Sequence, residues 1–220
     1  MVKKIIVLDL EFCMISKEYK KQFHHMKNEI IEIGAIMLDE SMNILDTYQK
    51  YVKPKYSEVS KRITKLTGIT NEMLADKEDF ETCIKDFIFW LGENLNETEI
   101  CSWSMTDLEQ IKYEIKEKNI AVENLDVFFE GWRDVQKEFS EGLCFDGIVS
   151  LEGAMHAVDE NFTGKAHDAL ADAQNTAKLV MLMKNKKMFD KKTKTLRSLF
   201  EKKDTGYTLG AELFKDFMSS

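Results

Sequence analysis

The chain reads KIIVLDLEF over residues 4–12, a short apolar run that ends in two acidic residues. A run of this length with β-branched residues fits a buried strand. Asp9 and Glu11 stand two residues apart at its end, and side chains at positions i and i+2 of a strand point to one face. Both carboxylates therefore converge on one spot, where they raise each other's pKa unless a cation neutralises them. The alternative is a frayed strand end whose carboxylates meet water or a neighbouring lysine.

Further apolar runs predict the rest of a sheet. The segments IIEIGAIML at 30–38 and ILDTYQKYV at 44–52 flank turn-forming residues 39–43, so the first three strands are expected to be adjacent and antiparallel. The segment EICSW at 99–103 predicts a fourth strand, and the run at 125–129 fits a fifth. Glu32 lies inside the second strand, where a hydrogen-bonded structural role is favoured over catalysis.

Apolar side chains at helical spacing predict the helices. These are a helix that stops at Gly68, one from Phe80 to Leu91, one that carries Leu108 to Ile115, and three that cover residues 131–140, 150–158 and 168–185. Strands first, then helices interleaved with two further strands, predict an α/β fold with a mixed five-stranded sheet flanked by helices.

The length of 220 residues fits one α/β domain. We place this domain at residues 1–190, with residues 191–220 as a basic, helical C-terminal extension that packs on the domain or on a partner. Residues 184–203 carry nine basic residues against two acidic ones. A solvated helical surface is favoured there over a nucleic-acid contact.

Composition limits the classes of function. A net charge of −8 argues against bulk electrostatic binding of nucleic acid, but divalent cations held by clustered acids reverse the local sign. No apolar stretch is long enough to cross a bilayer and the start does not resemble a signal peptide, so a cytoplasmic protein is expected. Four cysteines lack the spacing of a zinc site or a disulfide framework and are expected to be reduced, namely Cys13, Cys83, Cys101 and Cys144.

Two later segments add acidic residues to the candidate site. Asp107 follows the fourth predicted strand in the first turn of a helix, where it can reach the spot occupied by Asp9, although a helix dipole alone would also explain it. Asp168 is predicted to be an N-cap, which places His167 just before a helix and Asp172 about one turn inside it. A histidine and a carboxylate can then face one site.

Together these residues resemble a known family. The segments LDLEF with Asp9 and Glu11, SWSMTDLEQ with Asp107, and HDALADAQNTAKLV with His167 and Asp172 resemble, in order, the three motifs of the DEDDh exonuclease superfamily, which has an RNase H-like fold. The segments EIIEIGAIML and KLTGIT are similar to that family as well. Within the superfamily, the ICSW segment is most similar to the Eri-type and KapD exoribonuclease branch.

The resemblance implies an activity and a metal centre. The expected reaction is 3'-to-5' hydrolysis of phosphodiester bonds from the 3' end of RNA, with release of nucleoside 5'-monophosphates. Two divalent ions, Mg²⁺ or Mn²⁺, are expected. Asp9 would bridge both, Glu11 and Asp172 would complete one of the sites, and Asp107 would act mainly through water held by the metal. His167 would be the general base.

The resemblance also implies where the substrate lies. The terminal nucleotide is expected against a set of mainly apolar residues, namely Leu10, Phe12, Leu66, Ile69 and His167. Each apolar member is equally compatible with core packing. Cys13 stands where many relatives have threonine, so a hydroxyl contact is missing. The expected partner is single-stranded or 3'-overhanging nucleic acid, RNA preferred, bound by a monomer or a homodimer.

Three other interpretations stay open at this point. The first is a DNA 3'-5' exonuclease of the proofreading or repair type, because the contacts that recognise a 2'-hydroxyl cannot be placed from the sequence. The second is a non-catalytic nucleic-acid-binding module of the same fold. The third is an interaction protein whose acidic residues are ordinary caps and surface charges.

Overall fold

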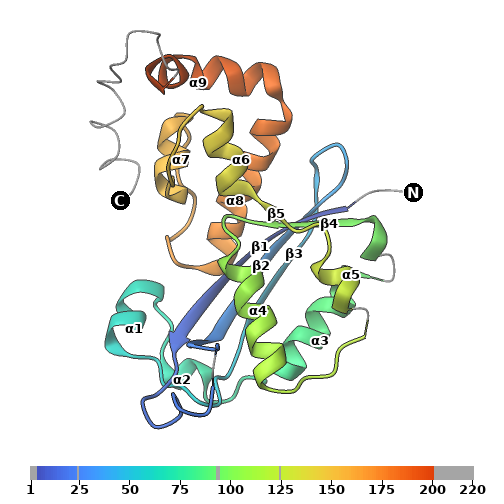
Figure 1. The fold of residues 1–220 in the computed structure, drawn as a ribbon, viewed down its shortest axis with the longest axis vertical. Coiled ribbons are helices and arrows are strands. Elements are labelled where there is room, and N and C mark those ends of the chain that lie inside the picture. The colour runs from blue at the N-terminus through green and yellow to red at the C-terminus, as the bar shows by residue number, and fades with distance from the viewer. Residues whose placement is uncertain (1–3, 24, 93–94, 124, 201–220) are drawn as a thin grey trace.

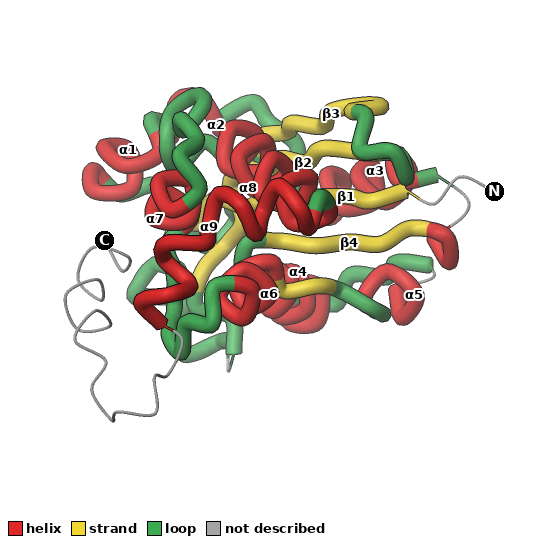
Figure 2. The backbone as a smooth tube through the Cα atoms, turned by 90° about the horizontal axis from the view of Figure 1, so that it is seen from above, coloured by secondary structure: helices red, strands yellow, loops and turns green. Residues whose placement is uncertain are grey.

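One mixed sheet of five strands organises the molecule, in the order β3-β2-β1-β4-β5. Our computed structural model describes residues 4–23, 25–92, 95–123 and 125–200. The strands are β1 (Lys4–Met14), β2 (Asn28–Leu38), β3 (Ile44–Tyr51), β4 (Thr98–Ser102) and β5 (Arg133–Asp134). β2 pairs antiparallel with β1 and β3, whereas β4 runs parallel to β1 and to β5. Figures 1 and 2 show β3, β2, β1 and β4 side by side, which confirms the predicted three antiparallel strands followed by two more.

Helices cover both faces of this sheet (Figure 1). They are α1 (Lys61–Thr67), α2 (Asn71–Leu74), α3 (Phe80–Leu91), α4 (Thr106–Glu117), α5 (Leu125–Phe129), α6 (Val135–Gly142), α7 (Leu151–Ala157), α8 (Ala169–Lys184) and α9 (Lys186–Phe200), with a short 3-10 turn at Leu95–Glu97. Ile6 and Leu8 of β1 pack in the core formed with α3 and α4, and Ile5 and Val7 pack in the core formed with α8. Odd-numbered positions of β1 therefore face α8.

The prediction of a fifth strand at residues 125–129 was wrong. This segment forms α5, and the fifth strand lies at Arg133–Asp134, inside the helix that the sequence predicted at 131–140. Phe128 is buried and its ring lies 6.2 Å from Phe87 and 5.7 Å from Trp132. A five-residue apolar run satisfies either period, so this packing against distant aromatic residues decides its conformation.

The C-terminal helix α9 continues across the proposed boundary at residue 190. Phe189 and Phe200 are buried, with rings 5.7 Å from Phe139 and 4.9 Å from Phe145. The described part of the predicted extension therefore packs on the same core as α6. The division at residue 190 stays a prediction, and residues 201–220 lie outside the described residues.

The sequence also predicted reduced cysteines and no segment long enough to cross a membrane. All four cysteines are free thiols; Cys13, Cys83 and Cys101 are buried and Cys144 is exposed. Within the described residues, no helix combines the length and the hydrophobicity that a membrane span requires.

Candidate active site

Asp9 and Glu11 lie on the face of β1 that α8 covers, and a glycine makes this close approach possible. Gly34 of β2 stands opposite Asp9 in the sheet. A Cβ atom added to Gly34 would lie 2.2 Å from the carbonyl carbon of Ala169, the first residue of α8. Only a residue without a side chain lets the start of α8 lie this close to the strands. The glycine therefore brings the beginning of α8 to the carboxylates of β1.

Asp107 reaches the same strand from the other side of the sheet. It lies in the first turn of α4 and is buried. The backbone N–H of Leu10, between Asp9 and Glu11, donates a hydrogen bond of 3.1 Å to Asp107 Oδ1. A contact with β1 is more than a helix dipole requires, so the structure brings Asp107 to the predicted site.

The start of α8 supplies the remaining two residues. Asp168 is the N-cap, as predicted, and accepts a 2.9 Å hydrogen bond from the N–H of Ala171. His167 has a left-handed backbone with φ of 63°. Its N–H donates a 3.1 Å hydrogen bond to Asp172 Oδ2, which fixes the carboxylate beside the histidine. Asp172 Oδ1 is buried and has no hydrogen-bond partner among the described residues.

The side chains of Glu11, His167 and Asp172 offer ligand atoms that all lie within 4.8 Å of one another. An orphan buried carboxylate oxygen is costly unless something binds it. A divalent cation fits this set, because hard cations take carboxylate oxygens. The oxygens of Glu11 and Asp172 are thus the first candidates for metal contact, and a nitrogen of His167 lies beside them.

Burial and mutual repulsion raise the pKa values of all four carboxyl groups. Burial, followed by repulsion from Asp107, Asp172 and Glu11, holds the pKa of Asp9 well above its usual range. The pKa of Glu11 rises to about 8, chiefly through burial and the charge of Asp172. Burial raises the pKa values of Asp107 and Asp172 to about 7. The carboxylates need a counter-charge to be ionised together.

His167 lies at the open edge of this carboxylate cluster and is exposed. Partial burial of the ring and the nearby charge of Lys165 lower its pKa below the ordinary value. The imidazole is therefore neutral at neutral pH and has a nitrogen available to accept a proton. A base at the edge of a cation site suits the activation of a water molecule.

Glu32 has the structural role that the sequence favoured. It accepts a 2.8 Å hydrogen bond from Gln49 Nε2 and a 3.2 Å hydrogen bond from the N–H of Ala169. Glu32 thus holds the start of α8 against the sheet; the sequence predicted a hydrogen-bonded role for it but not this partner. Gly34 was also missed, although a glycine within a strand signals close backbone approach.

The residues expected to contact the nucleotide differ in exposure. Leu66 is 42% exposed and available for contact, and Phe12 is half-buried. Leu10 and Ile69 are only 4% and 2% exposed, and both pack in hydrophobic cores. Cys13 is buried in the same small core as Ile69. Contact of these residues with substrate stays a prediction.

Three comparisons relate this fold and site to known proteins. A family model described as "Exonuclease" matches residues 6–180. Human ERI1 exoribonuclease 2 is 27% identical over 223 residues, which cover 91% of this chain and 31% of that protein. Rat 3'-5' exoribonuclease 1 is 25% identical over 166 residues, which cover 71% of this chain and 47% of that protein. The chain thus spans about a third to a half of the length of these relatives.

A solved structure has the same fold. The nuclease domain of 3'hExo, described as a DEDDh family member bound to rAMP, superposes with a TM-score of 0.67 at 21% identity, over 84% of this chain and 93% of that domain. The family match covers most of the chain, and the five residues of the three motifs lie together beside the middle of β1, which continues past Glu11 to Met14. The chain therefore belongs to the exonuclease family, and it is similar to ERI1 exoribonuclease 2 and to the nuclease domain of 3'hExo.

Proposed function

We propose that this chain is a metal-dependent 3'-to-5' exoribonuclease that releases nucleoside 5'-monophosphates from the 3' end of RNA. One observation carries the proposal: four carboxyl groups from β1, α4 and α8, three of them buried and that of Asp9 half-buried, lie together with raised pKa values beside an exposed neutral histidine. The similarity to an ERI1 exoribonuclease and to a 3'-5' exoribonuclease supports the direction of hydrolysis and RNA as the substrate.

Two ions, Mg²⁺ or Mn²⁺, would be held by the carboxylates of Asp9, Glu11, Asp107 and Asp172. When bound, the pair supplies charge relief to the leaving oxygen and favours deprotonation of water. The orphan Oδ1 of Asp172 is the structural feature that best fits such a cation. Hard oxygen ligands bind both metals, so activity must be compared in Mg²⁺ and in Mn²⁺.

The chain's own groups position the reactants. A nitrogen of the His167 imidazole would accept the proton of the attacking water, which its lowered pKa permits at neutral pH. The hydrogen bond from the His167 N–H to Asp172 fixes this residue relative to the carboxylates. The exposed side chain of Leu66 offers an apolar face to the last base.

A direct experiment compares RNA and DNA strands of one sequence, each labelled at the 5' end, with Mn²⁺ or Mg²⁺ and with a chelator. We expect a ladder of strands shortened from the 3' end, faster for RNA, and no hydrolysis in the chelator. A 3'-phosphate on the same strand should slow the reaction. Faster loss of DNA would assign the chain to the DNA exonucleases instead, and cleavage inside the strand would refute an exonuclease.

The second candidate function is not enzymatic: the chain would be a non-catalytic module that binds nucleic acid. Such a module has no need for all four carboxylates and the histidine, and its binding would be indifferent to the loss of Asp9. Binding of the labelled strand without hydrolysis, under any of the metals, would favour it over our proposal.

A further inference from the structure

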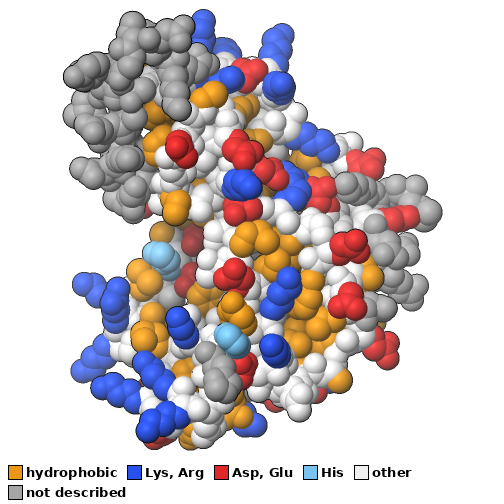
Figure 3. Space-filling model, viewed as in Figure 1, with side chains coloured by type: hydrophobic (Ala, Val, Ile, Leu, Met, Phe, Trp, Pro, Cys, Tyr) orange, Lys and Arg blue, Asp and Glu red, His pale blue; other side chains and the backbone are white. Residues whose placement is uncertain are grey.

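Basic side chains gather on one part of the surface, which we call the basic lobe and define as residues 15–23, 25–27 and 53–68. Nine exposed basic residues lie in it: Lys17, Lys20, Lys21, Lys27, Lys53, Lys55, Lys61, Arg62 and Lys65. Only Glu18 and Glu58 oppose them, which gives the lobe a formal charge of +7 in a chain whose total is −8. Figure 3 shows Lys and Arg side chains gathered over α1 and α2, at the lower left.

The two segments of the basic lobe form one surface. The N–H of Ser16 donates a 3.0 Å hydrogen bond to the carbonyl oxygen of Tyr56. The rings of Tyr19 and Phe23 pack on the ring of Tyr56, with centroids 5.4 Å and 4.8 Å away. Contacts of this kind hold the lysines of both segments on a common base.

The basic lobe borders the carboxylate site. The strand β1, which carries Asp9 and Glu11, leads directly into the lobe at residue 15. At the far end of α1, a Cβ added to Gly68 would lie 2.9 Å from Lys165 Nζ. Because Lys165 is two residues before His167, the lobe and the loop of the histidine meet beside the site.

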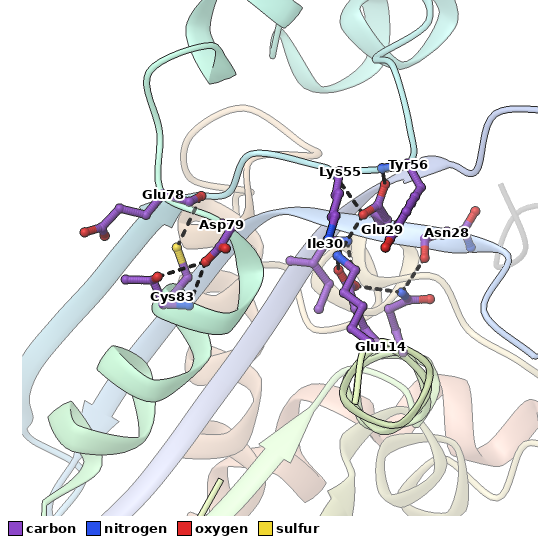
Figure 4. A network of polar contacts seen from close by, with 12 residues as sticks. Asn28, Glu29, Ile30, Lys55, Tyr56, Glu78, Asp79, Cys83 and Glu114 are labelled. Carbon is purple, nitrogen blue, oxygen red and sulfur yellow. Dashed lines mark hydrogen bonds and ion pairs between the residues drawn. The ribbon is translucent and has the colours of Figure 1, made fainter. Parts of the chain in front are cut away.

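A buried ionic network attaches the basic lobe to the sheet and to α4 (Figure 4). The N–H groups of Lys55 and Tyr56 donate hydrogen bonds of 2.9 and 2.7 Å to the two carboxylate oxygens of Glu29. Lys118 Nζ lies 2.7 Å from Glu29 and 2.6 Å from Glu114. Since α4 also carries a carboxylate of the active site, the network fixes the lobe relative to that site.

The cations of the basic lobe are only weakly opposed within the described part of the chain, where Lys53 and Lys55 act at a distance on Asp76 and Asp79. No ion pair joins any of the nine to a carboxylate that the structure describes, whereas Lys192 and Arg197 of α9 pair with Glu160 and Asp190. An open pocket of about 360 Å³ lies at the edge of the lobe, with Lys61 and Lys65 from the lobe and Glu72 from α2 in its lining. Unpaired cations on a fixed surface attract a polyanion, and its binding releases counter-ions.

We propose that the basic lobe binds the phosphodiester backbone of the strand upstream of its 3' end, so that the preferred substrate is a strand of several nucleotides rather than a dinucleotide. This inference rests on the proposed function. The lobe continues from a site suited to phosphodiester hydrolysis, and this favours nucleic acid over an acidic protein as its partner. The overall negative charge of the chain then limits binding to this surface.

The test uses two triple variants that each remove three positive charges from one helix. The lobe variant is Lys61→Gln/Arg62→Gln/Lys65→Gln on α1, and the matched control is Lys187→Gln/Lys191→Gln/Lys194→Gln on α9. Hydrolysis of a strand of about twenty nucleotides and of a dinucleotide is measured at several salt concentrations, and thermal melting verifies folding. We expect the lobe variant to lower the ratio of kcat/KM for the long strand to that for the dinucleotide about tenfold.

Salt dependence gives a second readout. Three lost phosphate contacts should reduce the slope of log(kcat/KM) against log salt for the long strand by about 2. The control should keep the parent's ratio and slope. A lobe variant with the parent's ratio and slope would overturn the proposal and leave an acidic protein as the partner.

Direct binding separates the two proposals. If the parent hydrolyses neither substrate, the proposed function fails, and the lobe is then tested by fluorescence anisotropy of the labelled strand. Weaker binding by the lobe variant than by the α9 control supports the lobe as a nucleic-acid surface. Equal binding by both variants would refute the lobe as a nucleic-acid surface.

Discussion

Helix α4 carries acidic side chains into two buried clusters that differ in how the chain neutralises them. Asp107 joins the carboxylates of the active site, and Glu114, two turns later, joins Glu29 and Lys118. In the second cluster, a lysine and backbone N–H groups satisfy the carboxylates. In the first, one carboxylate oxygen is orphaned, and burial together with repulsion between the groups raises their pKa values. Buried acids therefore indicate a ligand site only where the chain leaves their charge uncompensated.

The largest expected effect comes from Asp9→Asn. Loss of the Asp9 carboxylate, a proposed metal ligand, should lower the hydrolysis rate by about a thousandfold, which corresponds to the several kcal/mol that a metal pair contributes. The same change removes one of four mutually repelling groups. The melting temperature of the metal-free protein should therefore rise or stay the same. Single-turnover assays measure the rate, and melting curves measure the stability. A variant that is active, or one that is unfolded, contradicts the assignment of Asp9 as a metal ligand.

Lys118→Met should have the opposite effect to Asp9→Asn, because it should lower stability rather than the metal-dependent chemistry. It leaves Glu29 and Glu114 buried without their counter-charge, which should cost about 3–5 kcal/mol of unfolding free energy in urea titrations. Lys116→Gln, an exposed lysine of the same helix, is the control and should change stability by less than about 0.5 kcal/mol. The folded fraction of Lys118→Met should still require metal for hydrolysis.

A double variant sharpens this prediction. Adding Glu114→Gln to Lys118→Met removes one of the two stranded charges, so part of the lost stability should return. Strictly additive losses would show that Lys118 contributes packing rather than charge.

The sequence predicted the active-site cluster better than the ionic network, for physical reasons. Asp9 and Glu11 share a strand face by the period of two, and the cap at Asp168 fixes where α8 begins. These signals are local. The pairing of Glu29 with Lys118 joins distant parts of the chain, and no local pattern indicates it.

The fold likewise has parts that local patterns predict and parts that depend on contacts between distant residues. The first three strands and most helices follow from apolar periodicity, whereas residues 125–129 were assigned to the wrong element because Phe128 takes its conformation from contacts with Phe87 and Trp132. The basic lobe also depends on a contact between two segments that β2 and β3 separate, so composition alone gave only the net charge.

Gly34→Ala tests how closely α8 must approach the first cluster. The added methyl group meets backbone atoms of α8, which cannot move aside alone. We expect a loss of about 1–3 kcal/mol in unfolding free energy and a lower kcat, because the shift moves His167 and Asp172. In Gly142→Ala the new methyl group meets the ring of Phe189, a side chain away from the site, so kcat should be kept. Equal kcat values for the two variants would deny the close approach a role in activity.

The smallest effect expected is a pH dependence of stabilisation by metal. In the metal-free protein, Asp107 and Asp172 have folded pKa values near 7, above the usual value near 4 of an unfolded chain. Their contribution to stability is therefore fully present below about pH 4 and is lost as the pH rises through about 7. Metal binding needs the ionised carboxylates, so Mn²⁺ should raise the melting temperature more at pH 8 than at pH 5.5, by about 2–4 °C for each kcal/mol.

The cluster of Glu29, Glu114 and Lys118 serves as an internal control when melting temperature is measured against pH with and without Mn²⁺. Burial raises the pKa of Glu114 to about 7 as well, against the opposing effect of Lys118, so it too loses stability as the pH rises. That loss has no metal to reverse it. Asp9→Asn should therefore abolish the difference that Mn²⁺ makes while it leaves the remaining slope of melting temperature against pH in place. A Mn²⁺ effect that persists in Asp9→Asn, with the same pH dependence as in the parent, would place the cation outside the cluster of β1, α4 and α8.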